Sequence, residues 1–206
     1  MKKLALLVSG GGTNMQAIMD ACGSGEIDGK ISVVISSNHE AYALVRAKSA
    51  GIPAFVYAKK DYPTLACRDE EILRTLQAYD VDYVILAGYL GIIPKEIIKA
   101  YPNKIVNIHP ALLPKFGGKN FYGIHVHQAV IKAGEAESGA TAHFVSEEVD
   151  GGPIIRQQKL IVHKGDTPET LQCRILETIE HPMLVSVIKD LCADKISVVN
   201  GKVVNK

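Results

Sequence analysis

Three side chains in this sequence could together hold an oxyanion and move a proton. Asn107 and His109 follow an apolar run, and Asp150 lies in the segment Val149-Asp-Gly-Gly-Pro153. In an extended strand, residues two apart point to the same face, so Asn107 and His109 are predicted to project into one space. A carboxylate beside His109 would raise the proton affinity of the imidazole by opposite charge. The pattern predicts oxyanion stabilisation by one group and proton transfer by another.

Each of these residues also has a purely structural explanation. His109 could be a buried histidine hydrogen-bonded in a loop, and Asn107 and Asp150 could be turn residues. Their position at the carboxyl end of a strand favours function, because open parallel sheets place their ligand crevice there. His143 shares one face of a predicted strand with Thr141. We expect these two residues to have either a core or a supporting role.

A glycine-rich segment supplies a second candidate site. Ser9-Gly10-Gly11-Gly12-Thr13-Asn14 lies between a predicted strand and a predicted helix, where backbone N–H groups and the helix dipole attract an anion. The segment lacks the Gly-Lys-Ser/Thr ending of a P-loop, and Met15 occupies the third glycine position of a dinucleotide motif. The second strand ends in Ser36-Ser37-Asn38, without an acid for a ribose hydroxyl. The predicted ligand is a monophosphate, and the alternative is a plain glycine turn capped by Asn or Thr.

Residues that could bind a metal lack the necessary spacing. His125 and His127 have no third ligand at metal spacing, and we expect both at the surface, where a helix starts. The cysteines lie far apart, without paired spacing for zinc or redox chemistry: Cys22, Cys67, Cys173 and Cys192. We therefore expect no metal, and reduced thiols in a cytoplasmic protein.

The composition fits one folded domain that acts on small molecules. The 206 residues are 47% hydrophobic, which is enough to bury a substantial core. Lys plus Arg number 23 against 22 Asp plus Glu, and no basic block is present that would neutralise a phosphate backbone. We predict a single domain over residues 1–206 and no nucleic-acid partner.

The hydropathy of the chain predicts no membrane segment. Met1–Val8 imitates the start of a signal peptide, but its apolar run ends at Ser9 and the glycine cluster, so a first strand explains it better. No window reaches the ~18 apolar residues that a membrane helix needs. We therefore expect a soluble, cytoplasmic protein.

The elements that would position these residues alternate along the first half of the chain. The predicted strands are Leu4–Val8, Ile31–Ile35, Ala54–Tyr57, Tyr83–Leu86 and Ile105–Ile108. The predicted helices are Asn14–Cys22, Ala41–Ala50, Tyr62–Tyr79 and Lys95–Ala100. This alternation predicts an α/β fold with an open, mainly parallel sheet covered by helices. The glycine segment and Asn107–His109 would then lie at the same edge of the sheet.

The second half is predicted to begin with a long loop, because prolines and glycines crowd residues 110–123. A helix over residues 123–132 and the strands Thr141–Val145 and Ile154–Val162 follow, with Asp150-Gly151-Gly152 between the strands. Thr167 and Pro168 are predicted to cap and open a long helix. Residues 196–204 are predicted to form a hairpin around Asn200-Gly201.

The motifs also occur in a familiar order along the chain: Ser9–Asn14, Asn107–Pro114, His143–Val145 and Val149–Pro153. In this order they closely resemble the phosphoribosylglycinamide formyltransferases, folate-dependent enzymes of purine synthesis, over essentially the full length. The resemblance implies a formyltransferase fold with a Rossmann-like N-terminal half, 1–100, that binds phosphate. Residues 101–206 would form the folate-binding and catalytic half, extended by an antiparallel strand pair.

The resemblance also implies roles for individual residues. Asn107, His109 and Asp150 fall on catalytic positions, and Asp150 is expected to keep His109 protonated. The nucleotide substrate would be bound by Gly11, Gly12, Thr13, Asn14 and Glu180. The folate co-substrate would be bound by Leu90, Gly91, Ile92, Ile93, Ser146, Glu147, Glu148, Val149 and Asp150, together with Asn107 and Thr64. Thr141 and His143 would support the catalytic residues.

The chain departs from the family pattern at three places. Gly91 stands where the folate loop often has an arginine. A second folate-site arginine aligns with Thr64, and Arg68 lies one turn away. Pro182 is predicted to interrupt the helix that positions Glu180, because proline removes a helical hydrogen bond.

The implied reaction is formyl transfer from 10-formyltetrahydrofolate to the amine of glycinamide ribonucleotide. Two alternatives stay open. A 10-formyltetrahydrofolate deformylase would use the same three residues with water in place of the amine. A phosphate-binding module without catalysis would leave those residues unused. We expect a monomer or homodimer that acts on small molecules, with no metal and no membrane partner.

Overall fold

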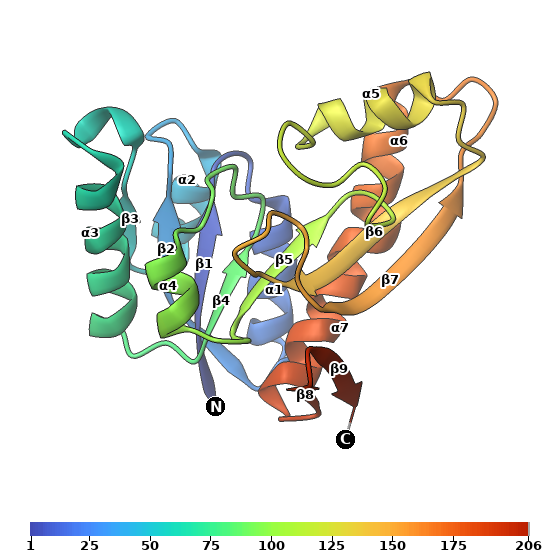
Figure 1. Cartoon of the computed structure of the whole chain (residues 1–206). Helices are drawn as coiled ribbons and strands as arrows, with labels where there is room; N and C mark the ends of the chain where they lie inside the picture. Colours follow the sequence, from blue (N-terminus) through green and yellow to red (C-terminus); the bar gives the residue numbers. More distant parts are fainter. Residues whose placement is uncertain (206) are drawn as a thin grey trace. The chain divides into compact units, whose positions relative to one another are not determined.

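The protein, described by a computed structural model over residues 1–205, falls into two compact units. The first is Met1–Val106, and the second runs from Asn107 onward. The described strands are β1 (Lys2–Val8), β2 (Gly29–Ser36), β3 (Ala54–Val56), β4 (Tyr83–Leu86), β5 (Ile105–His109), β6 (Glu137–Phe144), β7 (Ile154–Ile161), β8 (Ile196–Val199) and β9 (Lys202–Asn205). The sheet order is β3-β2-β1-β4-β5-β6-β7, and β8 pairs with β9 (Figure 1).

The strands of the first unit run parallel. β1 pairs with β2 and β4, and β2 pairs with β3. Residues Leu4–Val8 of β1 are fully buried, as expected for a parallel strand that is covered on both faces. The predicted alternation of strands and helices, and the open, mainly parallel α/β sheet, are therefore confirmed.

The helices of the first unit cover both faces of its sheet: α1 (Thr13–Gly23), α2 (Tyr42–Ser49), α3 (Leu65–Ala78) and α4 (Lys95–Ala100), with the short η1 (Lys59–Asp61) before α3. Parallel crossovers are nearly always right-handed, so connections running in opposite directions along a sheet place their helices on opposite faces. α1 and α2 pack together against β2, and α3 packs against α4 (Figure 1). The carboxyl end of β1 therefore meets α1 and α2.

The predicted start of α3 at Tyr62 is wrong. Thr64 has an extended backbone and its hydroxyl accepts a hydrogen bond from the Cys67 N–H at 3.2 Å, so the helix begins at Leu65. A threonine in this conformation is a favoured N-cap, because it satisfies an N–H that the first turn leaves without a partner.

The second unit is built on the predicted antiparallel pair, β6 and β7. β6 begins at Glu137 rather than at Thr141, because residues 137–140 pair with residues 158–161 of β7. The helices are α5 (Ile124–Lys132), α6 (Pro168–Ile175), the π-helical η2 (Leu176–Glu180) and α7 (His181–Cys192). α7 packs on β6 and β7, and α5 packs on α6 (Figure 1).

Three local predictions in the second unit are confirmed. Thr167 caps α6 in a reciprocal capping box with Thr170, and Pro168 occupies the first helical turn. β8 and β9 form a hairpin around Asn200 and Gly201, which both have positive φ, as the Asn-Gly turn requires. Residues 110–123 form neither helix nor strand, as predicted.

The predicted interruption of the last helix at Pro182 is wrong. Glu180 and His181 keep helical dihedral angles, and the His181 N–H donates to the Leu176 carbonyl five residues earlier. This wider turn joins α6 to α7 without a break. Pro182 follows directly on this wider turn, whose altered hydrogen-bond pattern accommodates a residue that has no N–H to donate.

Two further observations concern membrane-spanning helices and the state of the cysteines. Within residues 1–205, no helix has the length and apolarity required to span a bilayer. All four cysteines are thiols rather than disulfides, and Cys192 is the buried one among them.

Candidate active site

Asn107, His109 and Asp150 meet in the second unit. The Asn107 amide nitrogen lies 3.5 Å from one carboxylate oxygen of Asp150, and His109 Nδ1 lies 3.5 Å from the other. Asn107 and His109 therefore flank the same carboxylate, which confirms that they project into one space. His109 is 4% exposed, so this cluster is largely shielded from water.

The hydrogen bonds of His109 identify its titrating nitrogen. Nε2 lies 2.7 Å from the carbonyl oxygen of Phe116, which can only accept a hydrogen bond. Nε2 must therefore carry a hydrogen in both the neutral and the charged imidazole. The proton that His109 gains or loses is the one on Nδ1, the nitrogen that faces Asp150.

Burial controls the proton affinity of His109. Removal from water lowers the pKa of His109, while the Asp150 charge and the Phe116 carbonyl raise it and His143 lowers it. The net pKa lies below its ordinary value, so burial favours the neutral imidazole in the free protein, against the expectation that Asp150 keeps His109 protonated. At neutral pH, Nδ1 therefore carries a lone pair and can accept a proton.

Asp150 is the charged member of the cluster. Burial raises the pKa of Asp150, but the side chains of His143 and His109 and the Gly118 N–H lower it by more, and the net pKa is depressed. The Gly118 N–H donates to Asp150 Oδ2 at 2.9 Å. Asp150 also has a positive φ of 57°, which aspartate tolerates better than most residues, so its turn role and its site role coincide.

His143 is buried, and its side chain contacts Asn107. Its Nδ1 donates to the Phe144 carbonyl at 2.9 Å, and its Nε2 lies 3.1 Å from the Asn107 amide nitrogen. The same Nε2 lies 3.5 Å from Asp150 Oδ1. When Nε2 carries no proton it accepts a hydrogen bond, and one Asn107 N–H is then held by His143. The other is only weakly engaged by Asp150 at 3.5 Å, and it is the donor available to a developing oxyanion.

Thr141 supports the segment that follows His109. Its hydroxyl donates to the Ala111 carbonyl at 2.7 Å and accepts from the Leu113 N–H at 3.1 Å. Gln157, which sequence reasoning missed, donates to both Thr141 Oγ1 and the Leu113 carbonyl. Its place opposite Thr141 in the β6–β7 register is the signal that could have found it.

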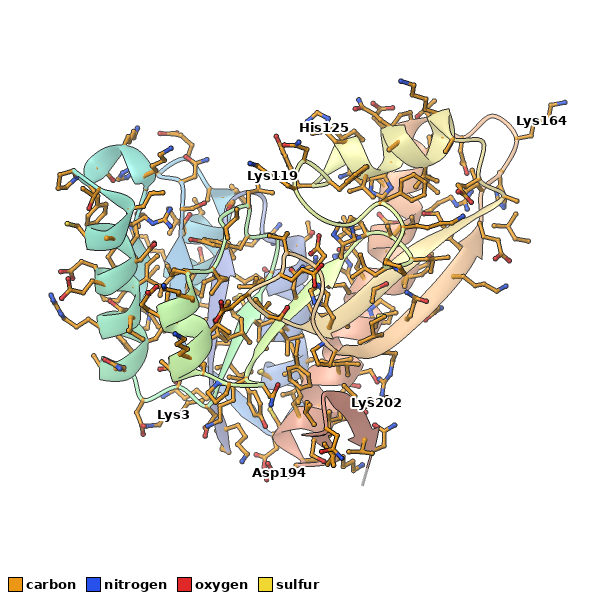
Figure 2. All side chains as sticks on the ribbon, viewed as in Figure 1. Lys3, Lys119, His125, Lys164, Asp194 and Lys202 are labelled. Atoms are coloured by element: carbon orange, nitrogen blue, oxygen red, sulfur yellow. The ribbon has the colours of Figure 1, made fainter. Side chains whose placement is uncertain are left out.

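One of the two predictions for the α5 histidines is wrong. His125 lies at the surface, as predicted (Figure 2). His127 is only 1% exposed, because Val126, His127 and Val130 form the buried side of α5. Burial, together with the smaller effect of the His109 charge nearby, lowers the pKa of His127 to about 4. His127 is therefore neutral beside the candidate site.

The glycine segment in the first unit separates into a packed part and an open part. Gly12 has a φ of 73°, and a Cβ added there would lie 2.7 Å from Ala43 Cβ. No described atom lies within 4 Å of a Cβ added at Gly10 or Gly11. Gly12 is thus explained by packing, whereas Gly10 and Gly11 leave space for a ligand. Thr13 is exposed and Asn14 is buried in the first turn of α1.

The predicted folate loop of the first unit presents apolar side chains to solvent. Leu90 is 62% exposed and Ile92 is 65% exposed, whereas Ile93 is buried. The Leu90 N–H donates to Ser9 Oγ at 2.8 Å, which ties the loop to the end of β1. A Cβ added at Gly91 would lie 2.6 Å from the Tyr89 ring, so an arginine at this position would require that ring to move.

Four further predicted site residues belong to the hairpin connection in the second unit. Ser146 Oγ donates to the Glu148 carbonyl at 3.0 Å, and Glu147, Glu148 and Val149 are exposed.

The remaining predicted site residues lie in α3 and η2. Thr64 caps α3, and the buried Arg68 donates to Asp69 at 2.8 Å. Glu180 is 7% exposed in η2.

Gly152 holds the connection that carries Asp150. A Cβ added at Gly152 would lie 1.8 Å from the Phe144 carbonyl oxygen. We therefore expect Gly152→Ala to lower the free energy of unfolding by about 1–3 kcal/mol, as overpacking does, and to lower activity by shifting Asp150. Chemical denaturation measures the first effect. The control is Gly23→Ala, where an added Cβ meets no described atom within 4 Å. Equal stability of the two variants would contradict the expected clash.

Comparisons with known proteins agree with this arrangement. A sequence profile described as formyl transferase matches residues 2–188. The chain is 46% identical over 189 residues to the phosphoribosylglycinamide formyltransferase of Haemophilus influenzae, covering 92% of this chain and 86% of that protein.

Solved structures give the same result. The crystal structure of glycinamide ribonucleotide transformylase 1 from Symbiobacterium toebii matches with a TM-score of 0.93 and 39% identity, covering 100% of this chain and 94% of the other. A formyltetrahydrofolate deformylase from Pseudomonas syringae pv. tomato is more distant, with a TM-score of 0.88 and 27% identity, covering 99% of this chain and 65% of the other. By its sequence and its fold alike, this chain belongs to the formyl transferase family.

Proposed function

We propose that this protein transfers the formyl group of 10-formyltetrahydrofolate to the amine of glycinamide ribonucleotide in purine biosynthesis. The products are formylglycinamide ribonucleotide and tetrahydrofolate. The observation that carries this proposal is the partly buried carboxylate of Asp150, which lies 3.5 Å from both Asn107 and His109. Such a cluster provides an oxyanion donor and a proton carrier without a protein nucleophile.

The substrate amine supplies the nucleophile in the proposed reaction. Its nitrogen bonds to the formyl carbon, and the carbonyl oxygen becomes an oxyanion that the Asn107 N–H stabilises. The neutral Nδ1 of His109 accepts the proton that the amine loses. The resulting imidazolium is stabilised by Asp150 and returns that proton to the departing folate nitrogen as the carbon–nitrogen bond breaks. The lowered pKa of His109 supports a neutral imidazole as the starting state.

We assign the two substrates to the segments whose local structure suits them. The phosphate of the nucleotide is assigned to Gly11, Gly12, Thr13 and Asn14, where the chain approaches the N-terminus of α1. Glu180 is assigned to the ribosyl portion. The folate is assigned to residues 90–93 and 146–150, supported by the exposed apolar surfaces of Leu90, Ile92 and Val149. Phosphate binding then belongs to the first unit and catalysis to the second, as parts of one catalytic domain.

We also assign Thr64 to the folate site. Thr64 already caps α3, so any contact of Thr64 with folate would use a hydroxyl that is engaged in the helix.

We propose a monomer or homodimer acting in the cytoplasm on small molecules, without a metal. The reduced state of the four cysteines fits that location.

A deformylase is the second candidate, because the same residues could activate water. The two functions differ in whether folate product forms without the nucleotide. We expect absorbance-monitored release of tetrahydrofolate from 10-formyltetrahydrofolate to require glycinamide ribonucleotide. Equal release with and without the nucleotide would establish the hydrolase instead. Absence of release in both cases would contradict both activities.

A further inference from the structure

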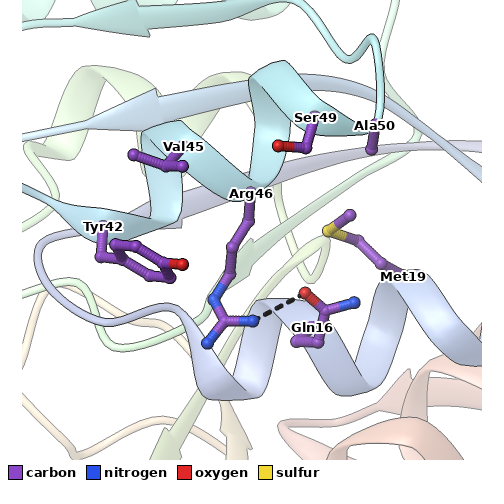
Figure 3. Close-up of a pocket in the computed structure, with 7 residues that line it drawn as sticks. All are labelled: Gln16, Met19, Tyr42, Val45, Arg46, Ser49 and Ala50. Carbon is purple, nitrogen blue, oxygen red and sulfur yellow. Dashed lines mark hydrogen bonds between the residues drawn. The ribbon is translucent and has the colours of Figure 1, made fainter.

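We propose that Arg46 of α2 positions the glycine segment so that two consecutive backbone N–H groups face the phosphate of the nucleotide. This inference rests on the proposed function of that segment. Arg46 lies in a hollow of about 360 Å³ between α1 and α2, lined by Gln16, Met19, Tyr42, Val45, Arg46, Ser49 and Ala50 (Figure 3). The guanidinium is half-buried there, and its carbon lies 5.1 Å from the centre of the Tyr42 ring.

The side chain of Arg46 links α2 to both the glycine segment and α1. Its Nε donates to the Gly11 carbonyl at 2.9 Å. Its Nη1 donates to Gln16 Oε1 at 2.8 Å, the bond that Figure 3 draws. The backbone of α2 adds a second bond, because the Ala43 N–H donates to the Gly10 carbonyl at 3.1 Å. Two successive carbonyl groups are therefore held by α2.

The direction of these carbonyls determines the direction of the neighbouring N–H groups. In a planar trans peptide, the C=O and the N–H point in opposite directions. The Gly10 carbonyl shares its peptide unit with the Gly11 N–H, and the Gly11 carbonyl shares its unit with the Gly12 N–H. Both N–H groups therefore point away from α2. Neither donates to another group within the part of the chain that the structure describes.

The space and the conformation on that side suit an anion. No described atom lies within 4 Å of a Cβ at Gly10 or Gly11, so a ligand can approach the backbone closely. The left-handed conformation of Gly12, at φ 73° and ψ 31°, turns successive N–H groups toward one concavity, as in anion-binding nests. Arg46 acts from the opposite side, so it is a positioning residue and does not touch the phosphate.

Holding the Gly11 carbonyl and attracting phosphate by charge are different roles for Arg46, and substitutions can distinguish them. Lysine would retain the positive charge, but its ammonium lacks the planar fork that spans Gly11 and Gln16. If Arg46 only attracted phosphate through its charge, Arg46→Lys would match the wild type, and the effect of Arg46→Met would disappear at high salt. If it holds the carbonyl, both variants are impaired at every salt concentration.

The test measures kcat and both KM values for Arg46→Met and Arg46→Lys at low and high ionic strength. We expect Arg46→Met to raise KM for glycinamide ribonucleotide about tenfold, the loss typical of one hydrogen bond to a charged group. The expected kcat stays within about twofold, and KM for the folate is unchanged. Arg46→Lys should show part of the same increase in KM for the nucleotide at both ionic strengths. Inhibition by inorganic phosphate should weaken in parallel.

Controls make each outcome decisive. Arg74→Met removes an exposed arginine of α3 that pairs with Glu70 and Glu71, and it should leave every constant unchanged. An unchanged nucleotide KM in Arg46→Met would overturn the proposal, as would a general loss of kcat, both KM values and melting temperature. Wild-type protein that releases product without the nucleotide would instead overturn the proposed function.

Discussion

Replacing His109 with alanine is expected to lower kcat by about 100-fold to 10,000-fold, the usual contribution of a positioned acid–base group. The variant keeps the Asn107 donor but loses the only nitrogen in this proposal that carries the amine proton to the folate. KM for both substrates should change little, since neither binding segment includes His109. Steady-state kinetics with both substrates at saturation would measure this effect.

The matched control for this variant is His125→Ala. His125 is exposed and bonds only locally, with its Nδ1 3.1 Å from Gln128 Oε1, so its loss should leave kcat unchanged. A His109→Ala enzyme with more than a tenth of wild-type kcat would show that water or the substrate carries the proton instead. Circular dichroism would establish that both variants keep the fold.

Replacing Asp150 with asparagine is expected to reduce kcat by roughly 100-fold or more, as loss of the charge that supports a catalytic imidazolium does in other triads. Asparagine tolerates the positive φ of this position, so the change removes the charge and leaves the turn intact. The imidazolium formed at His109 would then lack its opposite charge.

The pH dependence of the same variant has a defined direction. The wild-type enzyme should lose activity as pH falls through the pKa of His109, which burial holds below its ordinary value, because protonated Nδ1 cannot accept the amine proton. Asp150 raises that pKa, so Asp150→Asn should move the acidic limb of the kcat profile to still lower pH. A profile with an unmoved limb would mean that Asp150 does not act on His109.

The order of strands and helices in the first unit could be predicted from its sequence, because the apolar runs and the turn residues indicate the same boundaries. The apolar run at Leu4–Val8 has a strand's length, and the glycines after it leave few alternatives to a turn. The start of α3 was misplaced because Tyr62 fits a helical pattern locally. Thr64, which satisfies an N–H of the first turn, decides the boundary instead.

The residues of the candidate site could be identified, but their protonation could not. Spacing placed Asn107 and His109 on one face, and the order of motifs pointed to Asp150. The pKa of His109 depends on how completely the rest of the unit excludes water, which no local pattern of residues reports. The same limit explains His127, whose burial follows from the packing of α5 rather than from its polar side chain.

The wide turn at η2 has a consequence for how this helix can vary in sequence. Apolar side chains at Leu171, Ile175, Ile179, Met183, Val187 and Leu191 are all buried, each four residues after the last. In a uniform α-helix such a series would rotate by about 200° from end to end, at ~100° per residue. One additional residue in a turn sets the rotation back by about 100°, which keeps both ends within one apolar stripe. The apolar residues at both ends of the helix therefore face the same side. A strict four-residue apolar repeat, which would wind around a uniform α-helix, can stay buried along this one.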